Sequence, residues 1–408
     1  MSEHTLKVMT GDLRIGMFVA ELDRPWLDTP FLLQGFEIRD QEDLDSLHRY
    51  CTYVFIDLDR TPAHLLAGLP RPAPGKHMEE PLLAQPQGYR DAHSLEEELP
   101  QARAAHERLL ESLKTFFTRL TREKRLDVGA LQGDLNLMVD SVIRNPDAFA
   151  WLARLQKKDE YTYAHSLSCS VWAVSFGRQL GMHRNDLRQL ALGASLFDIG
   201  KLMIPGEILS KAERLTEDEM DVIRRHVDFG LELLGKDGGI SQTVREMVAH
   251  HHERFDGSGY PNGLKGTAIP LPGRIASIVD CYDAITTARP YQKPISPSAA
   301  VKKLYEWRGH DFQPELVEEF IQAIGLYPAG TLVELTTGEV AVVMAESRVR
   351  RLRPRVMVIL DPDKQLLGEF YKLDLLHDRG RTDARGGIEI REALEPGAYG
   401  IDPAALYL

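Results

Sequence analysis

HHERFDGSGYP, at residues 251–261, places two adjacent histidines and an acid before a glycine-rich turn. Polar and ionisable side chains are costly to bury without partners, so this composition does not suit a hydrophobic core. It suits a metal site with a ligand-binding lip beside it, because imidazole and carboxylate groups are common metal ligands. Residues elsewhere in the chain would have to complete such a site.

Further ligand-type side chains lie in the helical part of the sequence, each at the end or on one face of an expected helix. Together with the histidine pair, the candidates are His165, Asp198, His226, His251, His252 and Asp280. This mixture suits borderline divalent metals such as Fe, Mn, Co, Ni or Zn, and a helical bundle can converge such residues on one centre. His250 is a third consecutive histidine, but successive helical residues point about 100° apart, so we treat it as the spare.

Each candidate also has a plain structural interpretation. A lone histidine on a helix is more often a surface residue or a satisfied core residue. Asp198 could end its helix as a polar stop, and Asp280 could be a buried capping partner. The metal interpretation is favoured because the histidine pair, the acid and the glycine-rich turn occur together.

Composition places the chain among ordinary soluble proteins. Its 408 residues are enough for two or three domains and a sizeable core, and it is 43% apolar and 27% charged. The formal net charge of −12 argues against bulk attraction to nucleic acid or an anionic membrane. A local exception, which we interpret as a solvated strand face, is the set Arg348, Arg350, Arg351, Arg353 and Arg355.

Cysteine use and hydropathy predict a cytoplasmic, bacterial-type protein without membrane insertion. Cys51, Cys169 and Cys281 are far apart and too few for a disulfide framework, which fits a reducing compartment. The first residues show no basic region followed by an apolar run, so we expect no secretory signal. No stretch approaches the ~20 apolar residues that span a bilayer.

Hydrophobic periodicity predicts a mainly α protein with a small N-terminal α+β module and a short C-terminal β appendage. Near the N-terminus we expect strands at Val19–Leu22 and Tyr53–Asp57 and a short helix at Gln41–Tyr50. Later, the period changes to two at Thr331–Leu335, Val340–Met344 and Arg355–Leu360.

These patterns divide the chain into successive parts. They are an accessory module (1–60), a linker (61–100), a connecting helix (101–133), a helical domain (134–327), a β appendage (328–378) and a mobile tail (379–408). The linker is assigned because proline removes backbone donors and fixes φ. The apolar stripe of the connecting helix, from Leu109 to Leu120, predicts a domain contact or a homodimer contact.

Motifs spread over residues 140–325 carry a family resemblance. They comprise YTYAHS at 161–166, DIGK at 198–201, IP at 204–205, LSK at 209–211, LT at 215–216, His226, the stretch 251–261, IP at 269–270, RI at 274–275, Asp280, DA at 283–284 and RPY at 289–291. The region resembles the HD-GYP family, bacterial members of the HD metal-phosphohydrolase superfamily. The resemblance implies an HD-type helical bundle that hydrolyses the second messenger cyclic di-GMP.

The N-terminal module carries a second resemblance. LRIGMFV at 13–19, LDRPWL at 22–27 and PFL at 30–32 are similar to a domain of unknown function that often precedes HD-GYP domains. This similarity supports the architecture and gives no information on the signal that the module senses.

The resemblance to the HD-GYP family implies two metal sites that share one carboxylate. One site would consist of Asp198, His226, His251 and His252, and the other of His165, Asp198 and Asp280. Metal coordination produces a nucleophilic hydroxide at neutral pH, which the bridging Asp198 would help to hold. We expect one or two divalent ions, iron or manganese, and the linear product pGpG, with GMP as a further product.

Substrate contacts also follow from the resemblance. Lys201 would neutralise charge on the scissile phosphate or orient the nucleophile, and Arg289 would hold a phosphate. Lys293 would replace the basic residue that the family usually has at Gln292. The lip, Gly259-Tyr260-Pro261, would lie beside the substrate, and in related proteins it is implicated in contacts with diguanylate cyclase domains. The same three residues could also simply build a tight turn.

The chain departs from the family at Phe197, where the His of the His-Asp pair is expected. Phenylalanine cannot bind a metal, so the site of His165 and Asp280 would keep three ligands where the family has four. Weaker metal affinity is the minimum expectation, and a one-metal enzyme would activate water less well than a two-metal enzyme. A trinuclear site is not expected, because the Glu that it requires is replaced by Tyr161.

Three functions are compatible with these residues. The first is a metal-dependent cyclic di-GMP phosphodiesterase, because a site can tolerate one poor ligand when the surrounding shell is kept. The second is a catalytically inactive module that binds cyclic di-GMP or a cyclase partner, which Phe197 favours. The third is hydrolysis of another phosphoester, against which the lip and Arg289 argue. Turnover of cyclic di-GMP would distinguish the phosphodiesterase from the inactive module.

Overall fold

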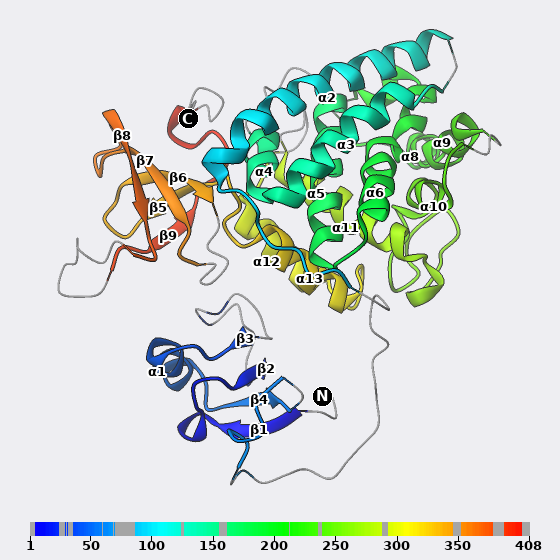
Figure 1. Ribbon diagram of the computed structural model, residues 1–408. Coiled ribbons are helices and arrows are strands. Elements are labelled where there is room, and N and C mark those ends of the chain that lie inside the picture. Colours follow the sequence, from blue (N-terminus) through cyan, green and yellow to red (C-terminus); the bar gives the residue numbers. More distant parts are fainter. Residues whose placement is uncertain are drawn as a thin grey trace. The chain divides into compact units, whose positions relative to one another are not determined.

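The computed structural model separates into two compact units, residues 1–84 and 85–408, which are described one at a time (Figure 1). It describes the chain except for residues 1–4, 24–28, 30, 32–35, 59, 68, 70–85, 124–125, 155–160, 212, 236–238, 288–292, 346–351, 378–386 and 402–408. Among the described helices, none has the length and hydropathy needed to cross a bilayer.

The first unit is a small antiparallel sheet with one α-helix. Its elements are β1 (Thr5–Met9), η1 (Thr10–Asp12), β2 (Phe18–Leu22), β3 (Phe36–Glu37), α1 (Gln41–Tyr50) and β4 (Tyr53–Asp57). The strand order is β1-β4-β2-β3, and alternate residues such as Val54 and Ile56 point into the core, where they are fully buried. Asp40 begins α1 because its side chain accepts hydrogen bonds from the amides of Glu42 and Asp43. The expected strands and helix of this unit are confirmed.

The second unit is mainly helical, as expected. Its helices are α2 (Leu95–Glu123), α3 (Gly129–Arg144), α4 (Pro146–Arg154), α5 (Tyr161–Gln179), α6 (Arg184–Leu196), η4 (Ile199–Met203), α7 (Gly206–Leu209), α8 (Glu217–Arg224), α9 (His226–Leu234), α10 (Gln242–His250), η5 (Gly266–Ala268), α11 (Leu271–Thr286), α12 (Pro297–Trp307) and α13 (Pro314–Ile324). Figure 1 shows α5 surrounded by α3, α4, α6 and α11. Its residues Val171 and Phe176 are fully buried, so α5 forms the centre of the bundle.

Helix α2 begins earlier than the proline count suggested. It starts at Leu95 and contains Pro100, inside the range assigned to the linker. The reason is a capping box: the Glu97 amide donates to Ser94 Oγ, and the Ser94 amide donates to the Glu97 carboxylate. The apolar stripe of α2, which includes Leu109 and Leu113, packs on α3 and α4 within the same unit.

An antiparallel β-sheet follows the bundle. Its strands are β5 (Leu332–Leu335), β6 (Val340–Ala345), β7 (Arg355–Leu360), β8 (Leu366–Asp374) and β9 (Ile390–Ala393), in the order β8-β7-β6-β5-β9. The expected β appendage is thus present.

The mobile tail expected over residues 379–408 is wrong for the part that forms β9. This strand pairs with β5 and follows the buried Ile388, so backbone hydrogen bonds and apolar burial hold it in place. Among the clustered arginines, Arg353 and Arg355 pair with Glu389 and Glu96, and the other three lie outside the described residues.

Candidate metal centre

The structure brings the six candidate ligands together from five parts of the bundle. His165 comes from α5, Asp198 from the junction of α6 and η4, His226 from the start of α9, His251 and His252 from the end of α10, and Asp280 from α11. Their burial ranges from full, for His226 and His251, to partial. His250, treated as the spare, belongs to neither of the clusters described below.

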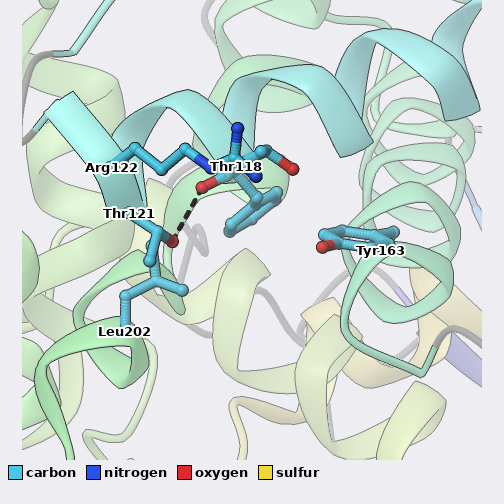
Figure 2. Close-up of a pocket in the computed structure, with 6 residues that line it drawn as sticks. Thr118, Thr121, Arg122, Tyr163 and Leu202 are labelled. Atoms are coloured by element: carbon cyan, nitrogen blue, oxygen red, sulfur yellow. Dashed lines mark hydrogen bonds between the residues drawn. The ribbon is translucent and has the colours of Figure 1, made fainter.

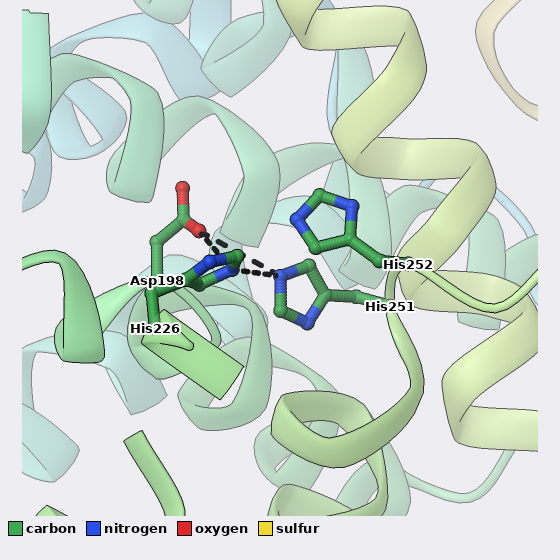
Figure 3. A group of neighbouring side chains, drawn as sticks. All are labelled: Asp198, His226, His251 and His252. Atoms are coloured by element: carbon green, nitrogen blue, oxygen red, sulfur yellow. Dashed lines mark hydrogen bonds and ion pairs between the residues drawn. The ribbon is translucent and has the colours of Figure 1, made fainter. Parts of the chain in front are cut away.

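The first cluster contains Asp198, His226, His251 and His252, whose potential ligand atoms all lie within 4.8 Å of one another. Figure 3 shows the carboxylate of Asp198 directed toward the rings of His226 and His251. The two Nε2 atoms of His226 and His251 are 3.2 Å apart, and Asp198 Oδ1 lies 3.5 Å and 3.6 Å from them.

Backbone carbonyls determine which nitrogens of His226 and His251 carry protons. His226 Nδ1 lies 2.7 Å from the oxygen of Ile223, and His251 Nδ1 lies 3.0 Å from the oxygen of Val248. A carbonyl oxygen only accepts, so both Nδ1 atoms must donate, and in the neutral rings the Nε2 atoms present lone pairs. Burial lowers the pKa of His226 to about 4, which keeps its ring neutral.

These atoms fit a bound cation. Two lone pairs at 3.2 Å repel each other, whereas nitrogens bound to one metal at about 2.1 Å are expected about 3.0–3.4 Å apart for angles near 90–109°. Asp198 Oδ1 is buried and has no hydrogen-bond partner among the described residues, and a buried oxygen without a partner is costly. A divalent metal would satisfy all three atoms.

The second cluster contains His165, Asp198 and Asp280. His165 Nε2 lies 3.4 Å from Asp198 Oδ2 and 3.4 Å from Asp280 Oδ1. Asp198 therefore directs one oxygen to each cluster. Burial alone would raise the pKa of Asp280, but His165 and His252 hold it well below its usual range, so the carboxylate is ionised.

The carboxylate of Asp283, recognised from the sequence only as part of the DA motif at 283–284, orients His165. Asp283 is buried, its Oδ2 lies 2.7 Å from His165 Nδ1, and its Oδ1 accepts a hydrogen bond from Trp172 Nε1 at 3.2 Å. Such a partner fixes the ring so that Nε2 faces a metal. The signal was present in the sequence, because Asp280 and Asp283 are three residues apart and therefore share one helical face.

Phe197 lies against both clusters. Its ring is 1% exposed, stacks on His251 with ring centroids 4.9 Å apart at 18°, and meets His165 edge-on at 5.9 Å. An apolar ring thus occupies the space beside His165 where a further ligand could stand.

Two residues of η4, Gly200 and Lys201, place this short helix against the metal centre. Lys201 Nζ lies 2.5 Å from Asp198 Oδ2 and its side chain is 34% exposed, so the ammonium meets both the cluster and solvent. Burial alone would raise the pKa of Asp198, but Lys201 and the histidines hold it well below its usual range. A Cβ at Gly200 would lie 1.8 Å from the carbonyl oxygen of His226, so only glycine lets η4 approach α9 this closely.

The lip is held by a buried acid. Glu253 is 1% exposed and accepts hydrogen bonds from the amides of Asn262 and Leu264 at 2.8 Å and 3.0 Å. The Tyr260 ring stacks on His252 with centroids 4.6 Å apart. A Cβ at Gly259 would lie 2.3 Å from the Arg254 amide nitrogen, which explains glycine there. In the sequence, Glu253 is recognisable only as part of the motif at 251–261, and its role in holding the lip was not predicted.

Three residues named in the sequence analysis are not placed at the clusters by the structure. Arg289 lies outside the described residues, and the side chain of Tyr161, the first residue of α5, is not described either. Lys293 is exposed, and within the described part of the chain no hydrogen bond or ion pair joins it to the clusters.

Family models match most of the chain. A model described as an HD domain matches residues 146–316. A model described as a domain of unknown function (DUF3391) matches residues 5–131, and therefore includes α2 as well as the first unit.

Curated relatives extend this match. The chain is 34% identical over 390 residues to a cyclic di-GMP phosphodiesterase of Pseudomonas aeruginosa, covering 95% of this chain and 92% of the relative. It is 40% identical over 181 residues to the cyclic di-GMP phosphodiesterase response regulator RpfG of Xanthomonas campestris, covering 44% and 48% of the two chains. It is 31% identical over 198 residues to 3′3′-cGAMP-specific phosphodiesterase 2 of Vibrio cholerae, covering 48% and 38%.

The last two relatives match only about half of the chain, whereas the first matches nearly all of it. The motifs around Asp198 and the lip fall inside the HD-domain match. The chain therefore belongs to the HD-GYP family of HD-domain proteins.

Proposed function

We propose that this protein is a metal-dependent phosphodiesterase that hydrolyses cyclic di-GMP to linear pGpG, with GMP as a further product. The observation that carries the proposal is the convergence of two Nε2 lone pairs, 3.2 Å apart, on Asp198 Oδ1, a buried oxygen without a hydrogen-bond partner among the described residues. The Pseudomonas relative, which is named for cyclic di-GMP hydrolysis, supports the choice of substrate because the match covers almost the whole of both chains.

The residues suggest which ions would bind and where. One ion would be held by Asp198, His226, His251 and His252, and a second, more weakly, by His165, Asp198 and Asp280. Mixed imidazole and carboxylate ligands suit iron or manganese. The ring of Phe197, which lies edge-on to His165, supports lower occupancy at the second position, because it offers no donor atom.

Hydrolysis adds water across one 3′–5′ phosphodiester, so that phosphorus gains the water oxygen and the 3′ oxygen leaves as a hydroxyl. When bound, a divalent metal lowers the pKa of water and polarises the phosphoryl group. Lys201, which faces both Asp198 and solvent, would donate hydrogen bonds to phosphoryl oxygens as negative charge develops on them. Tyr260 and the rest of the lip would lie beside the substrate, with Arg289 and Lys293 as further phosphate contacts.

The test is turnover of cyclic di-GMP by protein purified anaerobically with Fe(II) or Mn(II), beside Phe197→His and Asp198→Ala variants. We expect wild type to release pGpG and Asp198→Ala to release none, because both clusters lose their shared ligand. A silent wild type with an active Phe197→His variant would instead assign this chain to the inactive binding modules. If both were silent, a change at Phe197 alone would not explain the loss.

Other features remain proposals. We infer a cytoplasmic location, a lip that contacts diguanylate cyclase domains, and a homodimer. We also propose a division into an accessory module, a linker that ends before α2, the connecting helix α2, an HD-GYP domain and a β appendage. Pull-down with a cyclase domain and sedimentation of the full chain would test the two contacts.

A further inference from the structure

Helix α5 presents different faces to a pocket and to the metal centre. The pocket, of about 280 Å³, is lined by Tyr163 of α5 together with residues of α2 and Leu202 of η4 (Figure 2). Tyr163 and His165 are two residues apart, so their side chains leave the helix about 200° apart. Tyr163 therefore faces away from the ligand clusters, and the helical neighbours of His165 lie on another face of α5.

That other face carries His165, Cys169 and Trp172, which are spaced at i, i+4 and i+7 and are all buried. Asp283 of α11 joins the first and the last of them. Its Oδ2 lies 2.7 Å from His165 Nδ1, and its Oδ1 accepts a hydrogen bond from Trp172 Nε1 at 3.2 Å. The orientation of the His165 ring therefore depends, through one carboxylate, on the position of Trp172.

Arg154, the last residue of α4, contacts Trp172 in turn. The guanidinium carbon Cζ lies 5.0 Å from the centre of the Trp172 ring and 5.8 Å from the centre of the Tyr282 ring. A guanidinium Nη2 also donates a hydrogen bond to the Tyr282 hydroxyl. The two rings meet edge-on, with centroids 5.7 Å apart at 90°. A cation is attracted to the negative face of an aromatic ring, more strongly where water is excluded.

The guanidinium of Arg154 has few other partners. The residue is half-buried, and its Nε is buried without a hydrogen-bond partner among the described residues. Within the same part of the chain, no ion pair joins Arg154 to a carboxylate. The cation is therefore held mainly by the two aromatic rings and the tyrosine hydroxyl, and replacing it leaves no described carboxylate unpaired.

The stem of Arg154 contacts the start of the β appendage. A Cβ at Gly330 would lie 3.1 Å from Arg154 Cβ and 3.2 Å from its Cδ, and Gly330 has a φ of +86°, so glycine is required there. The Gly330 amide donates a hydrogen bond to the carbonyl of Val343 in β6 at 2.8 Å, and β6 itself packs against α4. The β-sheet is thus joined directly to Arg154.

These contacts form a continuous series from the β appendage to the second cluster. It runs from Gly330 through Arg154, Trp172 and Asp283 to His165. Close packing leaves side chains little freedom to move independently, so a displacement at one end affects the next residue. The histidines of the first cluster are not members of the series, and backbone carbonyls orient two of them.

We propose that Arg154 is a positioning residue for the second cluster: it fixes Trp172, Trp172 and Asp283 fix the ring of His165, and the β appendage acts on the centre through this contact. The inference rests on the part of the proposed function that assigns a metal to His165, Asp198 and Asp280. It does not depend on which phosphodiester is hydrolysed.

The test is metal binding by the full chain carrying Arg154→Met, which removes the cation and keeps an apolar stem. Competition titration of Mn(II) with a fluorescent chelator should show the second binding event weakened about 2- to 30-fold, as for substitutions along a contact network between two sites. The first event should be unchanged. Arg154→Lys, which keeps the cation, should lie between Arg154→Met and wild type.

Arg178→Met is the matched control. Arg178 also places its guanidinium near an aromatic ring, 5.7 Å from the centre of Tyr89, but it lies 13 residues, or about 20 Å, from His165 along α5. It should change thermal unfolding and leave both binding events as in wild type. Equal weakening of both events in Arg154→Met, or the same loss in Arg178→Met, would assign Arg154 to general stability and overturn its positioning role.

The titrations should be run in the wild-type and Phe197→His backgrounds, because the second cluster lacks a ligand in the wild type. If neither background binds a second ion, the inference is overturned, while turnover of cyclic di-GMP still decides the proposed function separately.

A double-mutant cycle tests the route through Trp172. Trp172→Phe removes the indole donor to Asp283. If Arg154 acts through this donor, adding Arg154→Met to Trp172→Phe should weaken the second binding event no further, because the two changes interrupt the same series. Additive losses of affinity would show that Arg154 acts by another route and would contradict the proposal.

Gly330→Ala tests the contact with the β appendage while Arg154 stays in place, and so also serves if Arg154→Met does not fold. Gly338→Ala is its control, because both glycines have a φ of +86° but a Cβ at Gly338 would meet Pro362 rather than Arg154. Both variants should lose stability, and only Gly330→Ala should weaken the second binding event, by at least about twofold. Equal Mn(II) affinities in the two variants would overturn the link to the β appendage.

Discussion

The two ligand clusters share Asp198 but differ in completeness. The first has three histidines around Asp198 Oδ1, and the tautomers of two of them are set by backbone carbonyls. The second has His165 and Asp280 around Asp198 Oδ2, with the ring of Phe197 alongside. The difference indicates that one ion position can be kept in full while its neighbour loses a ligand, because each cluster uses its own oxygen of the shared carboxylate.

Replacing Asp198 with Asn should have the largest effect, because it weakens both clusters at once. We expect turnover to fall by about 10³-fold or more, since metal ions contribute several kcal/mol of transition-state stabilisation. Metal content after dialysis, measured by mass spectrometry, should fall for both positions. Retention of one ion at wild-type affinity would contradict the sharing of Asp198.

Single histidines should separate the clusters. His226→Ala removes a ligand from the complete set, and His165→Ala removes one from the incomplete set. Dialysed His165→Ala should keep about one ion per chain, whereas His226→Ala should lose it. If both variants kept equal amounts of metal, the two clusters would not differ in affinity as the geometry indicates.

Phe197→His should strengthen the incomplete cluster. A fourth ligand beside His165 should bring the metal content close to two ions per chain. Phe197→Leu is the control, because it removes the ring without adding a donor. An increase of the same size in Phe197→Leu would assign the effect of Phe197 to crowding rather than to the missing imidazole.

Asp283→Asn should weaken the second cluster more mildly. Partners of metal-bound histidines typically change metal affinity about 10- to 100-fold. Asp283 contacts His165, and within the described residues no hydrogen bond or ion pair joins it to the first cluster. Competition titration with a fluorescent chelator should therefore weaken only the second binding event. Trp172→Phe, which removes the other partner of the same carboxylate, should have a smaller effect in the same direction.

Much of this comparison could be predicted from sequence, because ligand types and helical periodicity are local properties. The strands at Val19–Leu22 and Tyr53–Asp57 fall in this class, whereas the gathering of ligands around Asp198 was implied by the resemblance to the HD-GYP family. The tautomers could not be predicted, since they depend on the carbonyls of Ile223 and Val248, whose positions only the fold determines.

The tail shows a different limit. Residues rich in Gly, Arg and Asp lack the alternation that identifies a strand by itself, yet β9 pairs with β5 because a neighbouring edge was available to it. Local propensity therefore underestimates strands whose stability comes from a partner.

Of all these substitutions, Glu253→Gln should change metal binding by the two clusters least, because the lip borders the centre without belonging to either cluster. The buried carboxylate accepts two amide hydrogen bonds, and an amide group can accept only one of them while presenting a donor to the other. The free energy of unfolding should fall by about 1–3 kcal/mol, the cost of one buried unsatisfied group. Thermal unfolding measures this loss, with exposed Glu207→Gln as the control. Neither Glu253→Gln nor Glu207→Gln should change the metal content of the two clusters. If the second ion alone were lost, the lip would be supporting the incomplete cluster, and the difference between the clusters could no longer be explained by their ligands alone.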